Sequence, residues 1–249
     1  MDYEAIKFDI CCAARLLYRH GLSVANAGHL SVAVGADRML VNHFGPSFAT
    51  LRPENVVLVD FSGKVLDREA YVNDTIRLHG IIHRENPQAV AVAHTHPPAV
   101  VTYSTFRTVP EIYDQESCLL ADDVGLVEED YEGIASEEER VMPVARALRE
   151  KRAVILPNHG AITTGDNIQL AFARMILLEG MAQRNLAVAQ AARALGREPV
   201  PIAPEAARRA KAEIARIPVF APLWKDYLTR LRATDPDLFA GREAATTTA

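Results

Sequence analysis

The chain has 249 residues, which fits one large domain or two small ones. Its composition is 49% hydrophobic and 24% charged, and its net charge of −5 argues against general binding to nucleic acid or anionic membranes, which requires a basic face. No apolar run reaches the roughly 18 residues that span a bilayer. The N-terminus carries acidic residues, unlike a signal peptide, and three cysteines without CxxC spacing fit a reducing compartment. We therefore expect a soluble, cytoplasmic protein.

The first part of the sequence predicts helices mixed with short strands. Apolar side chains recur at helical spacing from residue 3, and β-like runs separated by turns follow. A second helix stops before Pro87, because proline disfavours the helical conformation in the residue that precedes it. The next run has small and β-branched residues without a helical period, which is typical of a buried strand. In chain order, these elements are helix 3–19, strands 29–34, 39–42 and 55–63, helix 75–86 and strand 89–94.

The second part predicts a loop, a pair of strands and several helices. Ser136 and Glu139 form a capping-box arrangement at the start of one helix, and Gly196 follows the end of a longer, alanine-rich one. The elements are an acid-rich loop 111–135, helix 136–151, a strand–turn–strand unit 152–165, helix 167–195, and a C-terminal segment with Trp224, Tyr227 and Phe239. The tail 241–249 is expected to be disordered. Without a clear mid-chain linker, residues 1–240 are predicted to form one α/β domain.

Two histidines stand at the end of the buried strand. The stretch AVAHTHPP places His94 and His96 one residue apart, and alternate residues of a strand point to the same face, so both imidazoles can converge on one ion. Neutral imidazole suits zinc, manganese, iron or cobalt, and open catalytic sites commonly use three protein ligands. His159, in LPNHGAI, is the candidate for the third ligand; the alternative is a turn histidine that caps its own backbone.

Three sequence blocks resemble the class II aldolase/adducin family. These blocks are NAGHLSV, HTHPP and NHG, and the resemblance covers about residues 5–195 with the family's order and spacing. It implies a three-layer α/β/α domain around a largely antiparallel central sheet, and a homotetramer with active sites at subunit interfaces. It also implies one divalent metal ion, Mn²⁺ or Zn²⁺ with Co²⁺ or Fe²⁺ as alternatives, held by His94, His96 and His159.

The sequence departs from the family's sugar-phosphate aldolases at the positions that bind phosphate. Those aldolases use a Gly-Asn-x-Ser turn, a Thr-Gly turn and a Ser-Ser pair, followed by a glutamate that handles protons. The corresponding residues here are Gly28 and His29 in the first turn, Phe44 in the second, Asn73 and Asp74 at the serine pair, and Thr75 at the glutamate. An anion site needs hydroxyls, backbone N–H groups or positive charge, so a phosphorylated sugar is not expected. A shift of one residue would place Asp74 at the glutamate position.

Loss of the glutamate favours a decarboxylase. Retro-aldol cleavage begins with removal of a hydroxyl proton by a positioned base, whereas a decarboxylation needs a sink for the electrons that CO₂ leaves behind, which a metal supplies as a Lewis acid stabilising enolate-like charge. The sequence resembles the branch of the family that decarboxylates hydroxylated aromatic or pyridine dicarboxylic acids. In that reading Phe44 stacks on the ring and Arg77 binds a second carboxylate. The catalytic candidates are Thr75 and the possible proton donors His29, His43 and His79; Gly28, Asn73 and Asp74 complete the predicted substrate site.

Several of these residues have structural alternatives. Arg77 can be a surface residue paired with an acid, and His79 lies on a different face of the predicted helix. His83, one turn further on, is expected on the helix surface. Two other functions stay open: an aldolase or epimerase acting on an unphosphorylated hydroxy acid or sugar with Asp74 as the acid, and a non-catalytic, adducin-like scaffold. A scaffold has no need of three convergent metal ligands.

Overall fold

The computed structural model describes residues 1–129 and 137–241, and these residues form a mixed α/β fold around one seven-stranded sheet. The strand order is β3-β2-β1-β4-β7-β6-β5. All neighbouring strands are antiparallel except β5 and β6, which run parallel. The strands are β1 (His29–Ala33), β2 (Arg38–Asn42), β3 (Val56–Asp60), β4 (Ala91–Thr95), β5 (Val124–Leu126), β6 (Ala153–Leu156) and β7 (Gly160–Gly165). The predicted fold class, with a largely antiparallel central sheet, is confirmed.

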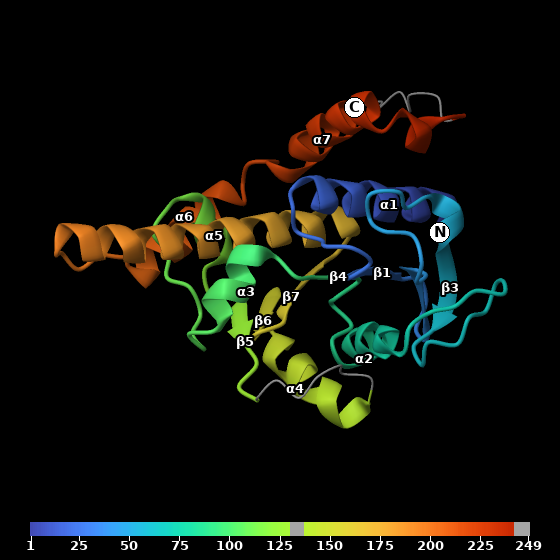
Figure 1. Cartoon of the computed structure of the whole chain (residues 1–249), viewed down its shortest axis with the longest axis horizontal. Coiled ribbons are helices and arrows are strands. Elements are labelled where there is room, and N and C mark those ends of the chain that lie inside the picture. Colours follow the sequence, from blue (N-terminus) through green and yellow to red (C-terminus); the bar gives the residue numbers. More distant parts are fainter. Residues whose placement is uncertain (130–136, 242–249) are drawn as a thin grey trace.

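Helices cover both faces of the sheet and complete the three layers (Figure 1). On one side lie α1 and α5, with α7 packed outside them, and on the other side lie α2 and α4. The helices in the described ranges are α1 (Tyr3–Arg19), α2 (Arg77–Glu85), α3 (Pro98–Ser104), α4 (Glu138–Leu148), α5 (Ile168–Leu195), α6 (Pro204–Ile214) and α7 (Phe220–Thr234). Short 3₁₀ helices are η1 (Pro53–Asn55), η2 (Asp74–Ile76), η3 (Glu116–Leu120) and η4 (Pro236–Phe239).

Strand β4 shows why the sheet needs cover on both faces. Its five residues are all buried, and successive side chains point to opposite faces of the sheet. Ala91 and Ala93 belong to the apolar core under α1 and α5, while Val92 belongs to the core under α2 and α4. The small alanines leave room for the large side chains of α5, including Phe172 and Met175, to approach the sheet.

Most predicted elements agree with the structure, and one does not. Asn167 accepts a hydrogen bond from the Leu170 N–H at the start of α5, and Gly196 takes a left-handed conformation with φ 61° at its end, as their residue types predict. The predicted 111–135 loop is wrong at residues 116–120, which form η3, and at residues 124–126, which form β5. Strand β5 has three residues, too few to show a period, and it is defined by pairing with β6 instead. The capping box at Ser136 and the tail 242–249 lie outside the described residues.

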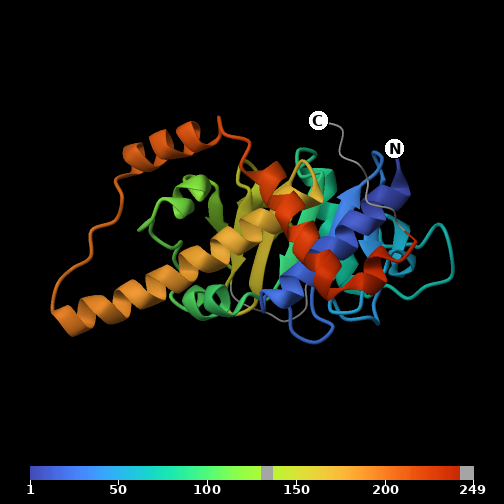
Figure 2. The ribbon, with the colours of Figure 1, turned by 90° about the horizontal axis from the view of Figure 1, so that it is seen from above.

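The longest helix, α5, extends beyond the edge of the sheet, and α6 returns alongside the body of the molecule (Figure 2). Among the residues that the structure describes, no helix is long and apolar enough to cross a membrane. At the other end, Trp224 and Tyr227 of α7 pack edge-on against Phe172 of α5, with ring centroids 5.8 and 5.2 Å apart. These two aromatic residues therefore have a packing role within their own chain.

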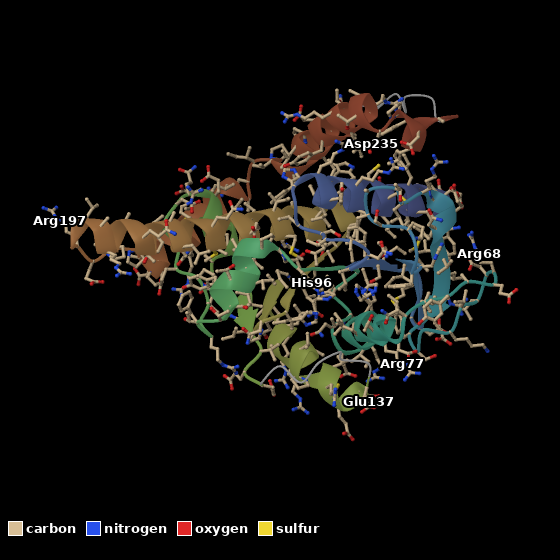
Figure 3. All side chains as sticks on the ribbon, viewed as in Figure 1. Arg68, Arg77, His96, Glu137, Arg197 and Asp235 are labelled. Carbon is tan, nitrogen blue, oxygen red and sulfur yellow. The ribbon has the colours of Figure 1, made fainter. Side chains whose placement is uncertain are left out.

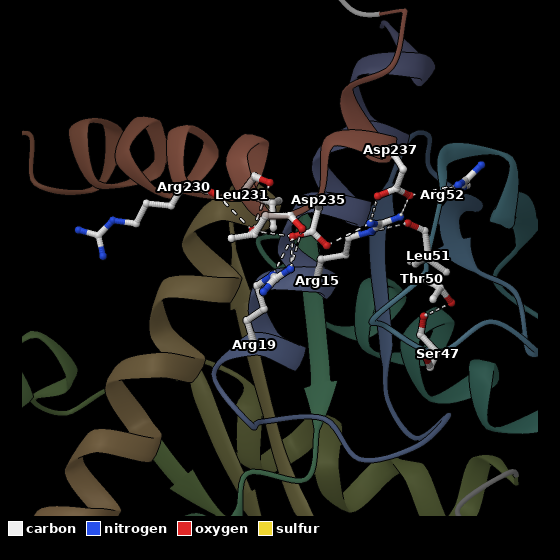
Figure 4. Close-up of polar contacts among 11 residues, drawn as sticks. Arg15, Arg19, Ser47, Thr50, Leu51, Arg52, Arg230, Leu231, Asp235 and Asp237 are labelled. Atoms are coloured by element: carbon white, nitrogen blue, oxygen red, sulfur yellow. Dashed lines mark hydrogen bonds and ion pairs between the residues drawn. The ribbon is translucent and has the colours of Figure 1, made fainter.

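A network of ion pairs fastens the C-terminal segment to α1 (Figure 4). The guanidinium of Arg15, only 3% exposed, donates to Asp235 at 3.1 Å and to Asp237 at 2.8 and 2.7 Å. Arg19 donates to the other oxygen of Asp235 at 2.7 Å. The hydrogen bond from Arg15 lowers the pKa of Asp237 to about 2. A buried guanidinium with two carboxylate partners is stable only while those partners are present.

Asp235→Ala should therefore lower the free energy of unfolding by about 3 kcal/mol, because it leaves the buried Arg15 with part of its charge uncompensated. Urea denaturation followed by circular dichroism measures this change. The matched control is Asp226→Ala, which removes an exposed i,i+4 pair with Arg230 at 2.8 Å and should cost less than about 0.5 kcal/mol. Equal losses in the two variants would contradict the importance of the buried network.

Candidate metal centre

Three histidines from separate segments converge at one end of the sheet. His94 is in β4, His96 lies just beyond it, and His159 stands in the turn between β6 and β7. One ligand nitrogen from each lies within 4.8 Å of the others, and the ring centroids are 4.9 to 5.1 Å apart. The structure thus brings together the three residues that the sequence singled out as metal ligands.

The close pairing of β4 and β7 sets the position of the triad. A Cβ on Gly160 would lie 2.4 Å from the Thr95 carbonyl oxygen and 2.8 Å from Cδ2 of His96, so only glycine permits this approach. Asn158, two residues before Gly160, has a left-handed backbone with φ 57°. Its N–H donates a hydrogen bond to the Ser104 hydroxyl of α3 at 2.9 Å. The short motif NHG therefore contains a turn residue, a candidate metal ligand and a contact that requires glycine.

The helix that follows His96 is anchored by a buried acid on α5. Pro97 and Pro98 end the strand and start α3. The Glu179 carboxylate, 5% exposed, accepts hydrogen bonds from the Ala99 N–H at 3.0 and 3.1 Å and from the Val100 N–H at 3.0 Å. A carboxylate at this position satisfies N–H groups that have no partner within the helix. Glu179 thereby holds the segment that carries His94 and His96.

The protonation of the triad suits a divalent cation. Nδ1 of His94 lies 3.0 Å from the Ala161 carbonyl oxygen, which can only accept, so Nδ1 carries the hydrogen and Nε2 is left with a lone pair. Nε2 of His96 is buried and has no hydrogen-bond partner in residues 1–129 and 137–241. Burial lowers the pKa of His159 to about 4 and that of His94 well below its usual value. Neutral imidazoles are the form that binds metal, so these residues fit a divalent ion.

The triad forms part of the wall of a pocket of about 370 Å³. Five other lining residues were predicted from the sequence: Gly28, His29, Phe44, Asn73 and Thr75. Three were not predicted: Asn26, Ala27 and Leu78. Asn26 and Ala27 directly precede Gly28 in the turn before β1, and that position is the signal that could have found them. Most of the surface that these residues expose to the pocket is apolar, and their polar groups are four imidazoles, two amides and one hydroxyl.

The turn at Gly28 closes tightly on the triad. Gly28 has φ +112°, and a Cβ there would lie 3.1 Å from the His94 carbonyl oxygen. The amide of Asn42 on β2 accepts a hydrogen bond from the Leu30 N–H at 2.8 Å, which holds the start of β1. In the register of β1 against β4, His29 lies opposite His94. His29 is consequently the histidine that lies beside the metal site without belonging to the triad.

The structure separates the other predicted residues from this pocket. Arg77 is exposed and lines a neighbouring hollow of about 220 Å³ with Asp74; Asn73 borders both cavities. Figure 3 shows Arg77 on α2, apart from His96 at the strand ends. Nδ1 of His43 is 2.8 Å from the Phe44 carbonyl oxygen, and the ring does not line the pocket. His79 is fully buried behind the lining, with its ring centroid 5.7 Å from that of His29.

The prediction for His83 was wrong. His83 is 4% exposed, its ring stacks on Phe61 at a centroid distance of 5.7 Å, and its Nε2 lies 2.8 Å from the Ser31 hydroxyl. Histidines on helices are more often exposed than buried, which is why the sequence predicted an exposed His83. His79 and His83 are four residues apart, however, and so share the buried face of α2. That spacing, together with a serine two residues after His29, was the available signal.

Burial of His83 predicts a pH-dependent stability. Burial lowers its pKa to about 4, whereas an unfolded histidine titrates near 6.5. Between these values the unfolded chain binds the proton and the folded chain does not, so the stabilisation is complete above about pH 6.5 and is lost as the pH falls to about 4. His83→Phe, which keeps a ring beside Phe61, should reduce the loss of unfolding free energy between about pH 7 and pH 4.5 by on the order of 2 kcal/mol. Urea denaturation at both pH values tests this, and an unchanged pH dependence would contradict it.

The fold and the triad place the chain in a known class of proteins. Residues 8–186 match the family Class II Aldolase and Adducin N-terminal domain, and the chain belongs to this family. Members include lyases, both aldolases and decarboxylases.

Individual relatives carry several activities. The chain is 30% identical over 218 residues to 4-hydroxy-3-prenylphenylpyruvate oxygenase/4-hydroxy-3-prenylbenzoate synthase from Streptomyces roseochromogenus subsp. oscitans, covering 85% of this chain and 73% of the relative. It is 28% identical over 202 residues to 3,4-dihydroxyphthalate decarboxylase from Terrabacter sp., covering 76% and 83%. Its fold is similar to that of L-fuculose 1-phosphate aldolase from Glaciozyma antarctica, with a TM-score of 0.80 and 25% identity over 95% of this chain and 92% of the other.

Proposed function

We propose that this protein is a metal-dependent decarboxylase of a hydroxylated aromatic or pyridine dicarboxylic acid. The observation that carries the proposal is the lining of the pocket: no described lining residue is an aspartate or a glutamate. Thr75 lies in that lining, while Asp74 faces the neighbouring hollow. An aldolase reaction needs a positioned base at its first step, and loss of CO₂ does not.

The shape and chemistry of the walls suit a flat ring. Phe44 and Leu78 provide apolar surface, and Phe44 is 42% exposed, so its ring face is available for stacking. When bound to the triad, a divalent ion supplies the Lewis acidity that draws electrons toward the ring oxygen as CO₂ departs. Thr75 is held in the wall by its hydroxyl, which donates to the Asn73 side chain at 2.7 Å.

Two further residues receive roles in this proposal. His29 carries the proton to the ring carbon, because neither His43 nor His79 lines the pocket in the described structure. Arg77 binds the second carboxylate from the hollow beyond Asn73, where its guanidinium can offer a bidentate contact. The native ion is Mn²⁺ or Zn²⁺, with Co²⁺ or Fe²⁺ as alternatives. The active form is a cytoplasmic homotetramer.

The relatives support this function and also a second one. The decarboxylase from Terrabacter acts, by its name, on a dihydroxylated benzene dicarboxylic acid, which is the chemical class proposed here. The structural similarity to an L-fuculose 1-phosphate aldolase favours an aldolase or epimerase as the second candidate, with an unphosphorylated hydroxy acid or sugar as substrate.

Activity assays on a panel of candidate substrates distinguish the two candidate functions. Metal-loaded protein is incubated with hydroxylated phthalates and pyridine dicarboxylates while CO₂ is measured, and with unphosphorylated hydroxy acids and sugars while aldehyde release and epimerisation are measured. We expect CO₂ from at least one aromatic acid and no aldehyde. Aldehyde release or epimerisation without CO₂ release would replace the decarboxylase with the second candidate.

Thr75→Glu provides an internal check on the alignment. Because the three histidines that could hold the ion are unchanged, the variant should retain divalent metal. Appearance of aldolase activity in this variant would support the assignment of Thr75 to the glutamate position of the aldolases. Loss of metal would contradict the view that the triad binds it without help from this position.

A further inference from the structure

Three buried side chains form a hydrogen-bonded chain behind the pocket. Ser31 on β1 lies between two histidines of α2, with its hydroxyl 2.7 Å from Nδ1 of His79 and 2.8 Å from Nε2 of His83. Nδ1 of His83 lies 2.6 Å from the Ala89 carbonyl oxygen. Ser31 and His79 have no exposed surface, and His83 is 4% exposed. None of the three lines the pocket.

The Ala89 carbonyl determines the direction of every hydrogen bond in this chain. A carbonyl only accepts, so His83 carries its hydrogen on Nδ1 and its Nε2 must accept. The Ser31 hydroxyl has one hydrogen, which it donates to Nε2 of His83. Ser31 then has only a lone pair for His79, so Nδ1 of His79 donates. The chain therefore leaves Nε2 of His79 as an acceptor. Burial keeps both imidazoles neutral, since it lowers the pKa of His83 to about 4 and that of His79 well below its usual value.

Two buried nitrogens remain at the pocket end of the chain. Nε2 of His79 and Nδ1 of His29 are both buried, and neither has a hydrogen-bond partner within the part of the chain that the structure describes. Their rings are neighbours in an edge-to-face arrangement, with centroids 5.7 Å apart and an interplanar angle of 89°. Buried polar atoms in native structures are normally paired, directly or through an ordered water. A direct hydrogen bond between these two nitrogens requires a donor on His29, because Nε2 of His79 is an acceptor.

We propose that His83 and Ser31 are positioning residues that act through His79, whose Nε2 accepts a hydrogen bond from Nδ1–H of His29 after a small rotation of the two neighbouring rings. The chain holds His29 in a single tautomer, with Nε2 left as the nitrogen that accepts a hydrogen bond from a ligand in the pocket. Its effect on catalysis rests on the proposed function, in which the substrate carries a ring hydroxyl that can supply that hydrogen. The tautomers themselves do not depend on the reaction.

Nitrogen-15 NMR of histidine-labelled, Zn²⁺-loaded protein tests the proposal, because protonated and unprotonated ring nitrogens give distinct signals. In the wild type we expect His29, His79 and His83 each to be protonated on Nδ1 and unprotonated on Nε2. In Ser31→Ala, His83 should keep its tautomer, whereas His79 should lose its single tautomer and show a mixture. Protonation of Nε2 on His79 or His29 in the wild type would overturn the proposal.

A second variant predicts a reversal. His83→Phe preserves the ring beside Phe61 but frees the Ser31 hydroxyl to donate to Nδ1 of His79, so His79 should switch to the Nε2–H form. The control is Ser117→Ala, which removes another buried serine hydroxyl, one that donates to Asp114 at 2.7 Å, and should leave the three imidazole signals unchanged. An unchanged His79 signal in both Ser31→Ala and His83→Phe would overturn the proposed chain.

Steady-state kinetics then tests whether the hydrogen-bonded chain of Ser31, His79 and His83 affects the reaction. Ser31→Ala should lower kcat for CO₂ release about tenfold with KM and metal content unchanged. If the tautomers are as expected but the wild type releases no CO₂ from any panel compound, the proposed decarboxylase function is wrong. The hydrogen-bonded chain of Ser31, His79 and His83 is then still supported. If the wild type releases CO₂ and Ser31→Ala retains full kcat, the catalytic role of the chain is wrong.

Discussion

His96→Ala should remove the bound divalent ion and abolish catalysis. Among the described residues its buried Nε2 has no hydrogen-bond partner, which leaves the lone pair available to bind a metal ion. We expect metal affinity to fall by more than about 100-fold, since even outer contacts to metal ligands contribute roughly 10- to 100-fold. Competition with a fluorescent chelator measures the affinity, and elemental analysis measures the metal content. Activity should disappear in proportion to the metal lost.

The control for this variant is His20→Ala. The His20 ring contacts Phe172 and Tyr227, and none of these three residues lines the pocket. This variant should keep its full metal content even if packing around α7 loosens. Wild-type metal affinity in His96→Ala, or a loss of metal in both variants, would show that the triad is not the metal site.

Gly160→Ala should both destabilise the fold and disturb the metal site. The new Cβ would lie 2.4 Å from a backbone oxygen, which cannot move aside without separating β7 from β4. We expect the free energy of unfolding to fall by about 3 kcal/mol, at the upper end of the usual cost of overpacking. Metal content should fall as well, because the same Cβ would lie 2.8 Å from the His96 ring. Urea denaturation and elemental analysis give the two readouts.

Gly180→Ala is the matched control within the same chain. Gly180 lies inside α5, and a Cβ there would meet nothing within 4 Å. Alanine is favoured over glycine in a helix interior, so this variant should gain about 1 kcal/mol and keep its metal. Destabilisation of both variants to a similar degree would mean that the strand contact at Gly160 is not the cause.

The sequence supports part of the metal site on physical grounds alone. Alternation along a strand explains why His94 and His96 can share an ion. The predicted buried strand is present as β4. His159 lies 63 residues beyond His96, and no local pattern joins the two. Its place after a buried run made it a candidate ligand, and the family resemblance linked it to the other two histidines. The contact that joins them is the pairing of β4 with β7, which is a property of the whole sheet.

The wrong prediction for His83 has its origin in tertiary packing. Helical spacing correctly separated Arg77 from His79, but it could not say which of the two faces meets the sheet. His83 was assigned to solvent because most polar helix residues are exposed, whereas here the tight approach of α2 at Gly80, where a Cβ would lie 1.9 Å from the Phe61 carbonyl oxygen, buries the whole face. Tertiary packing of this kind overrides residue averages and is not encoded in any short stretch.

The buried carboxylate of Glu179 has a consequence for protein design. The motif HTHPP is a strand end with two candidate metal ligands, and a designer could copy it onto another sheet. Its geometry nevertheless depends on an acid 80 residues away, which accepts hydrogen bonds from the Ala99 and Val100 N–H groups directly after the prolines. A transplanted site would need that supporting acid and the glycine at the facing strand, because ligands are only as well placed as the groups that hold their backbone. The smallest transferable unit of this centre is therefore a strand pair and two helices.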